Sequence, residues 1–128
     1  MNRTIIIAEA GVNHNGDIFL AKELIKLASL AGADFVKFQS FKANKLVTKN
    51  AKQARYQEIN MGLKISQFEM LEKLEINEEQ HHILIEECKK YSIGFLSSAF
   101  DLEGLNFVNS LGVKYIKIPS GELTNLPY

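Results

Sequence analysis

Four short runs rich in β-branched and aromatic residues stand out along the chain. They are residues 4–8, 34–39, 93–98 and 114–118. Runs of this length are typical of strands in a parallel sheet, where both faces are covered. The first run is the most apolar, and it is predicted to be buried on both faces and to end at Glu9.

The longer stretches between these runs have a helical period and helix-ending signals. Asp17 and Asp101 are placed to cap helix N-termini, and Gly32 and Gly112 stand where the same helices should end. Capping boxes are predicted at residues 66–69 and 77–80. The predicted apolar stripe of the first helix is Leu20, Leu24, Leu27, Ala28 and Ala31. The predicted stripe of the helix after the second capping box is His81, Leu84, Cys88 and Tyr91.

Strands that alternate with helices predict an α/β fold of parallel β/α units with right-handed crossovers. Either a doubly wound open sheet or part of a (β/α)₈ barrel fits this order. No glycine-rich phosphate fingerprint follows the first strand, which weakens the case for a dinucleotide fold. Polar residues at the end of every strand favour the barrel, because that end builds the active site there. These residues are Glu9, Lys37, Gln39, Ser97, Ser98, Lys117 and Ser120.

Composition and charge narrow the range of partners. The 128 residues are 46% hydrophobic and 23% charged, which suits one compact domain. The formal net charge is zero, so we expect neither nucleic acid nor a membrane as partner. Cys88 is the single cysteine, so we expect a buried structural thiol and a reducing cytoplasm. The apolar run before Glu9 is too short for a signal peptide or a membrane span.

Two lysines interrupt otherwise apolar strands at matching places. Lys37 lies in GADFVKF and Lys117 in GVKYIKI, each after a predicted helix end. A buried lysine requires a partner, so the pair indicates a shared anionic ligand; two lysines exposed at sheet edges are the alternative. Residues 40–64 carry six basic side chains and one acidic side chain, and six minus one gives +5. This segment is either a solvated face or a basic lid over an acidic ligand.

Three motifs carry a resemblance to a known family. They are EAGVNHNG at residues 9–16, VKFQSF at residues 36–41 and IKIPSGE at residues 116–122. In this order they resemble the signatures of the sialic acid synthase family, and residues 41–49 most resemble its legionaminic acid branch. The resemblance implies a (β/α)₈ barrel of about 250 residues, usually followed by an antifreeze-like domain. Residues 1–128 are then expected to be the first four β/α units of that barrel.

The same resemblance implies an activity. Members condense phosphoenolpyruvate with an N-acetylated mannosamine-type sugar, which gives a nine-carbon sugar of the neuraminate or legionaminate type and releases phosphate. A divalent metal, Mn²⁺ or Mg²⁺, is expected in the full-length enzyme. Its histidine ligands are expected beyond residue 128, so we expect no metal on this fragment, which should be inactive by itself. A homodimer is the expected assembly.

Roles for individual residues follow from the matching motifs. The expected catalytic residues are Glu9, Lys37 and Gln39, of which Glu9 and Gln39 would hold the amino sugar. The residues expected to bind the phosphate and carboxylate of phosphoenolpyruvate are Lys37, Ser98, Lys117 and Ser120. Three further residues are expected to bind substrate, namely Asn13, His14 and Glu122.

Two other functions remain open on the residues alone. A class I aldolase would use a strand-end lysine to form a Schiff base with a keto acid. A non-catalytic module would bind an anion through its basic segment without turnover.

Overall fold

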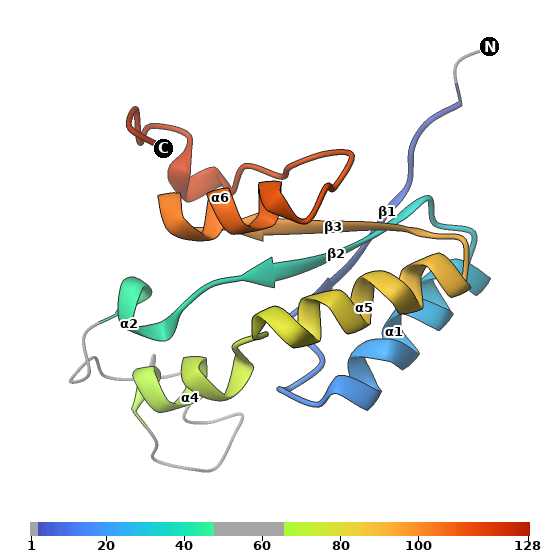
Figure 1. The fold of residues 1–128 in the computed structure, drawn as a ribbon, viewed down its shortest axis with the longest axis horizontal. Coiled ribbons are helices and arrows are strands. Elements are labelled where there is room, and N and C mark those ends of the chain that lie inside the picture. Colours follow the sequence, from blue (N-terminus) through green and yellow to red (C-terminus); the bar gives the residue numbers. More distant parts are fainter. Residues whose placement is uncertain (1–2, 48–65) are drawn as a thin grey trace.

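The computed structural model describes residues 3–47 and 66–128, which form a parallel sheet with helices packed against it (Figure 1). The strands are β1 (Ile7–Gly11), β2 (Phe35–Ser40) and β3 (Gly94–Ala99). The helices are α1 (Ile18–Leu30), α2 (Ala43–Leu46), α4 (Gln67–Leu74), α5 (Glu78–Lys90) and α6 (Leu102–Ser110), with a short 3₁₀ turn, η1, at Ser120–Glu122. The α/β class and the parallel β/α units are therefore as predicted.

The register of the sheet decides which side chains share a face. The strand order is β1-β2-β3, and both pairings are parallel. Glu9 lies opposite Lys37 on β2, and Gln39 lies opposite Ser98 on β3. Residues two apart on a strand point the same way. The four side chains therefore lie on one face, which we call the open face.

The helices cover the opposite face of the sheet, where the hydrophobic core lies. Figure 1 shows α1 and α5 side by side beneath the strands. Val36 and Phe38 point toward them and are almost fully buried, and the Phe38 ring stacks on Phe95 at 5.9 Å. The core residues supplied by α1 and α5 are Ala21, Ile25, Ala28, Leu84 and Cys88.

The predicted helix ends are confirmed. The Asp17 carboxylate accepts hydrogen bonds from the first turn of α1, and Asp101 accepts one from the first turn of α6. Both predicted capping boxes form, at Ser66 for α4 and at Asn77 for α5. These signals work because the groups that satisfy the free helix N–H groups lie within three residues of them.

The predicted stripe of α1 is wrong in part. Ala21, Ile25 and Ala28 are the buried residues, whereas Leu20 and Leu27 are 39% and 53% exposed. The helix is apolar on more than one side, so its periodicity does not select the buried side. Contact with the sheet and with α5 selects the side that carries two alanines, because small side chains permit close packing.

Two strand predictions also need correction. The first strand begins at Ile7 and continues past Glu9 to Gly11, and Ile7 is 49% exposed rather than buried. β1 is an edge strand, and no described helix covers the open face beside it. The fourth strand, predicted at residues 114–118, is reduced to one parallel bridge between Lys117 and Ser98. One bridge supplies few ladder hydrogen bonds, and the following Pro119 has no N–H to extend them.

Several smaller expectations concern composition. Cys88 is buried, and burial together with the nearby Glu87 raises the pKa of its thiol to about 12, so it is a structural thiol.

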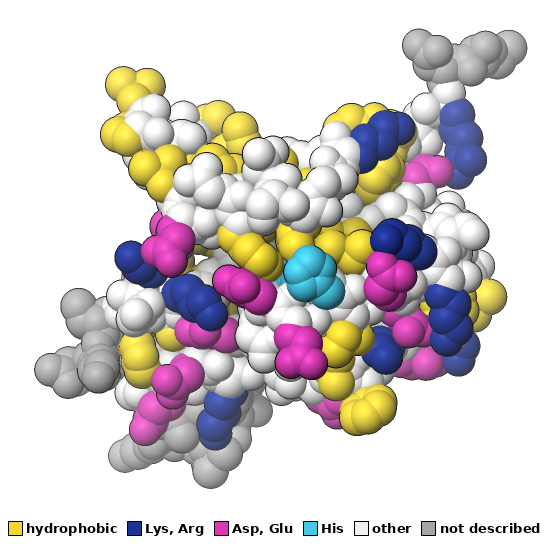
Figure 2. Space-filling view, viewed as in Figure 1, with side chains coloured by type: hydrophobic (Ala, Val, Ile, Leu, Met, Phe, Trp, Pro, Cys, Tyr) yellow, Lys and Arg dark blue, Asp and Glu magenta, His cyan; other side chains and the backbone are white. Residues whose placement is uncertain are grey.

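Figure 2 shows acidic and basic side chains interspersed over the face that carries α5. Most of the basic segment lies outside the described residues, but Lys42 and Lys45 form ion pairs with Glu75 and Glu103. No helix in the described ranges is long and apolar enough to cross a membrane.

Candidate functional site

A carboxylate, an ammonium and an amide meet on the open face, near the C-terminal ends of β1 and β2. The Lys37 Nζ lies 2.7 Å from Oε2 and 2.8 Å from Oε1 of Glu9. The Lys37 side chain is only 11% exposed, whereas that of Glu9 is 55% exposed. Lys37 therefore has the partner that a nearly buried lysine requires, and the carboxylate remains within reach of solvent.

Gly11 lets this group assemble. The β1–β2 register shifts between Glu9 and Gly11, and Gly11 has a φ of +55°. A Cβ at this position would lie 3.1 Å from the Glu9 Oε1 and 3.7 Å from the Gln39 Nε2. Both polar groups therefore converge on the space that a side chain would fill. A glycine inside a strand pattern often marks such a bulge or close approach, so this residue could have been found from the sequence.

Ser98 and Lys117 continue the same face toward the C-terminus. Ser98 is buried on β3 opposite Gln39, and its bridge to Lys117 places that residue beside it. The Lys117 Nζ donates to the Ile118 carbonyl at 2.6 Å and is exposed. A shared anionic ligand for Lys37 and Lys117 is consistent with this register and stays a prediction.

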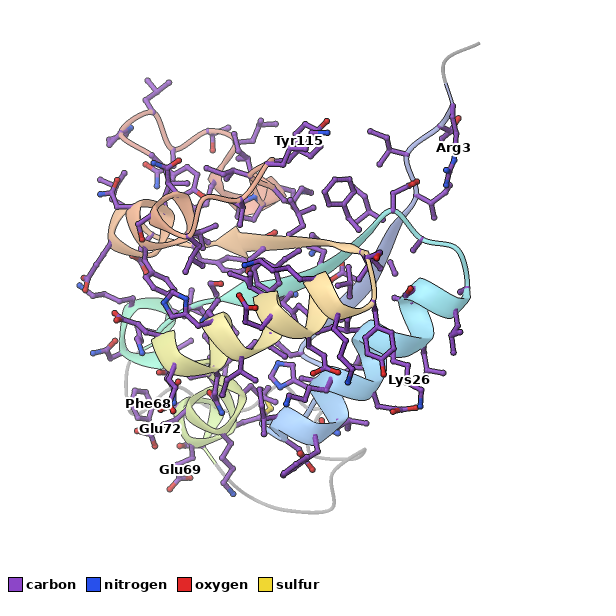
Figure 3. All side chains as sticks on the ribbon, turned by 45° about the vertical axis from the view of Figure 1, so that its right-hand side comes forward. Arg3, Lys26, Phe68, Glu69, Glu72 and Tyr115 are labelled. Atoms are coloured by element: carbon purple, nitrogen blue, oxygen red, sulfur yellow. The ribbon has the colours of Figure 1, made fainter. Side chains whose placement is uncertain are left out.

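An apolar hollow lies beside Lys117. It has a volume of about 250 Å³, and its polar lining residue is Lys117. Tyr115 forms one wall through an edge contact with Phe35, with ring centroids 5.4 Å apart. Phe35 and Leu96 also line the hollow, and the strand register puts both on the face of Lys37, so the hollow lies on the open face. Figure 3 shows Tyr115 beyond β3 as seen from α5. Its other lining residues are Ile5, Ile7 and Ile116.

Asn13 and His14, the predicted site residues in the β1–α1 loop, lie in different environments. Asn13 is exposed, whereas His14 is 2% exposed with its ring 6.1 Å from that of Phe38, on the helix-covered side. The His14 Nδ1 accepts a hydrogen bond from the Gly16 N–H, and burial lowers the pKa of the ring. The structure thus does not bring His14 to Glu9 and Lys37, and a binding role for either loop residue stays a prediction.

The last predicted residues lie beyond Lys117. Ser120 and Glu122 form the turn η1, where Ser120 is exposed and the Glu122 carboxylate accepts a hydrogen bond from Asn125 at 2.6 Å. No contact within the described residues joins either of them to Glu9 or Lys37. Their roles also stay predictions.

The described residues do not fit the divalent metal that the resemblance implies. Within residues 3–47 and 66–128, no three His, Cys, Asp or Glu side chains gather closely enough to hold a metal ion. Glu9 is the carboxylate of the group around Lys37, and no two further His, Cys, Asp or Glu side chains of the described residues gather with it.

Polar groups at the C-terminal ends of parallel strands, with helices on the other face, define the class of β/α proteins that build an active site at this end. The NeuB family profile matches residues 24–128, so the chain belongs to the NeuB family.

Relatives and solved structures agree with this membership. The chain is 56% identical to the N,N'-diacetyllegionaminic acid synthase of Campylobacter jejuni over all of its 128 residues and 38% of that protein. It is 54% identical to the synthase of the same name from Legionella pneumophila, over 96% of this chain and 35% of the other. The N-acetylneuraminic acid synthetase structure from Leptospira borgpetersenii superposes with a TM-score of 0.79 at 29% identity. That superposition covers 98% of this chain and 39% of the synthetase. The chain thus spans little more than a third of these proteins.

Proposed function

We propose that this chain supplies the phosphoenolpyruvate-binding part of a synthase that joins phosphoenolpyruvate to an N-acetylated amino sugar. The group formed by Glu9, Lys37 and Gln39 on the open face carries this proposal. The relatives named as N,N'-diacetyllegionaminic acid synthases support a product of the legionaminate type.

Each residue of the group has a chemical task in this proposal. Phosphoenolpyruvate is a compact anion, and ammonium and hydroxyl donors bind such groups through charge-assisted hydrogen bonds. Lys37, Lys117 and Ser98 would supply these donors. The half-exposed Glu9 carboxylate and the Gln39 amide would hold hydroxyl and amide groups of the sugar next to the reacting carbon.

The reaction that we assign is a condensation with C–O cleavage. The C3 carbon of phosphoenolpyruvate uses its double-bond electron pair to form a bond to the sugar aldehyde carbon. The C=O electron pair of the aldehyde moves onto its oxygen, which takes up one proton and becomes a hydroxyl. Water adds at C2, and the bond from C2 to the phosphate oxygen breaks. The water oxygen becomes the C2 ketone oxygen, and of its two protons one goes to the new hydroxyl and one to the released phosphate. Lys37 would position the donor and offset its charge. Mn²⁺ or Mg²⁺ would need ligands from outside the described residues, and it would polarise the sugar aldehyde when bound.

The binding step can be tested on the chain itself by titration calorimetry. Phosphoenolpyruvate should bind more tightly than inorganic phosphate or pyruvate alone, because donors on two strands engage both of its charged ends. Equal affinity for phosphate and phosphoenolpyruvate would instead indicate a simple anion-binding module. Absence of phosphoenolpyruvate binding would contradict the proposal.

The class I aldolase alternative has its own test. Treatment with pyruvate and borohydride should leave the mass of the chain unchanged, because the Lys37 nitrogen is held by Glu9 at 2.7 Å and is not free to attack a carbonyl. A covalent adduct on Lys37 or Lys117 would favour the aldolase.

Assembly and location are also proposals. Ile5, Ile6 and Ile7, before and at the start of β1, are exposed, and no described helix covers the open face of this edge strand. Both features favour a homodimer, which sedimentation of the chain would reveal as twice the monomer mass. A cytoplasmic location is supported by the free thiol of Cys88.

A further inference from the structure

Behind the open face, three polar side chains form a hydrogen-bonded network inside the core. The Ser40 Oγ lies 2.6 Å from the His81 Nε2 and 2.6 Å from the Ser97 Oγ. The His81 Nδ1 lies 2.8 Å from the Asn77 carbonyl oxygen. We propose that this network positions Gln39 and Ser98 for ligand binding, an inference that rests on the proposed function.

The direction of each hydrogen bond follows from the chemistry of the groups. A carbonyl can only accept, so the His81 Nδ1 carries the hydrogen and donates it to Asn77. Burial lowers the pKa of His81, which keeps the ring neutral and leaves its Nε2 as an acceptor. Ser40 therefore donates to His81, and the Ser40 oxygen accepts from Ser97. All three bonds point one way, an arrangement in which each bond strengthens the next.

The surroundings make these bonds expensive to lose. Ser40, His81 and Ser97 are each 3% exposed or less. The imidazole packs against the rings of Phe95 and Phe107, with centroids 6.2 Å and 5.0 Å away. A buried polar group left without a partner costs far more than an exposed one. The network is therefore expected to hold one arrangement rather than several.

The two serines stand directly behind two predicted ligand-binding residues. Ser40 follows Gln39 on β2, and Ser97 precedes Ser98 on β3. Adjacent residues on a strand point to opposite faces, so a bond between the serines on the core side joins the strands where Gln39 and Ser98 project on the open side. His81 then ties this point to the first turn of α5.

The location of the network argues for positioning rather than chemistry. A serine and a histidine in hydrogen-bond contact can act as a nucleophile and its general base. Ser40 and His81 both line a cavity of about 90 Å³ in the seam between α5 and α6. Figure 2 shows hydrophobic side chains in this seam. Both residues are nonetheless on the helix side of the sheet, away from Lys37, so they reach the open face only through the backbone of β2 and β3.

The test compares two serine-to-alanine variants of the full chain. Ser40→Ala removes the centre of the network. Ser29→Ala is the matched control, because the Ser29 hydroxyl also makes a partly buried hydrogen bond, to the Tyr91 carbonyl at 2.8 Å, far from the strand ends. Denaturant unfolding should show that both variants lose stability. Ser40→Ala alone should weaken phosphoenolpyruvate binding, by about tenfold, and Ser40→Thr should restore it by returning the hydroxyl.

Amide hydrogen exchange gives a readout that does not depend on the ligand. In Ser40→Ala, protection should fall at the last residues of β2 and β3 and persist at their first residues. If the wild-type chain binds no phosphoenolpyruvate, the proposed function fails, and this local loss of protection still decides whether the network holds the strand ends.

Two results would overturn the inference. One is a folded Ser40→Ala variant with wild-type affinity, and the other is a uniform change in exchange along both strands. If Ser40→Ala does not fold, Ser97→Ala replaces it, since that variant keeps the bond between Ser40 and His81. Its affinity should then fall several-fold, and wild-type affinity in this variant would equally overturn the inference.

Discussion

Replacing Lys37 with methionine isolates the charge at the centre of the candidate site. The Lys37 side chain is only 11% exposed, so its aliphatic stem is packed against its neighbours. Methionine keeps most of this stem. The variant loses the ion pair to Glu9, but that carboxylate is 55% exposed and stays solvated after the change. Ion pairs in contact with solvent contribute up to about 1 kcal/mol. We therefore expect the free energy of unfolding to fall by no more than about 1 kcal/mol.

The effect on binding should be larger than the effect on stability. A hydrogen bond to a charged group contributes about 1.5–3 kcal/mol. If the Lys37 ammonium makes one such bond to phosphoenolpyruvate, its loss corresponds to an increase in Kd of about 10- to 150-fold. Calorimetric titration of the chain measures the Kd, and urea unfolding measures the stability.

Lys42→Met is the control for loss of one positive charge nearby. Lys42 also makes an ion pair, to Glu75 at 3.3 Å, but its side chain is 56% exposed and lines the cavity between α5 and α6, on the helix side of the sheet. We expect its Kd for phosphoenolpyruvate to stay within about twofold of wild type, because exposed charges are screened by salt. A Lys37→Met chain with wild-type affinity, or an equal loss in both variants, would refute the assignment of Lys37 to the site.

Two further predictions concern backbone strain and pH. Gly11→Ala and Gly32→Ala should each cost about 1 kcal/mol of stability, because φ is +55° and +80°. Only Gly11→Ala should shift the Glu9 carboxylate signal in carbon NMR, since nothing lies within 4 Å of a Cβ at Gly32; an unchanged signal would count against the close approach. Stability in urea should fall as the pH drops below about 6.5. Burial lowers the pKa of His14 and His81, so the unfolded chain binds these protons first, and a flat profile from pH 7.5 to 5 would contradict this.

The sequence by itself determined the features that depend on near neighbours. The caps at Asp17, Ser66 and Asn77 form as predicted, because donor and acceptor lie within three residues of each other. β2 and β3 lie within one residue of their predicted bounds, and the alternation of Lys37 with its buried neighbours follows from the two-residue period of a strand. Polar residues at the predicted strand ends include Glu9 and Lys37, which form an ion pair in the structure.

Tertiary structure decided the partners and the buried surfaces. Glu9 and Lys37 are 28 residues apart and pair only because β1 and β2 are adjacent and in this register. Ser40 reaches His81 across 41 residues for the same kind of reason. The buried side of α1 and the reduction of the fourth strand to one bridge depend on which neighbours are present to pack and to pair. Local periodicity carries no information about such distant contacts, so these features became visible only in the folded chain.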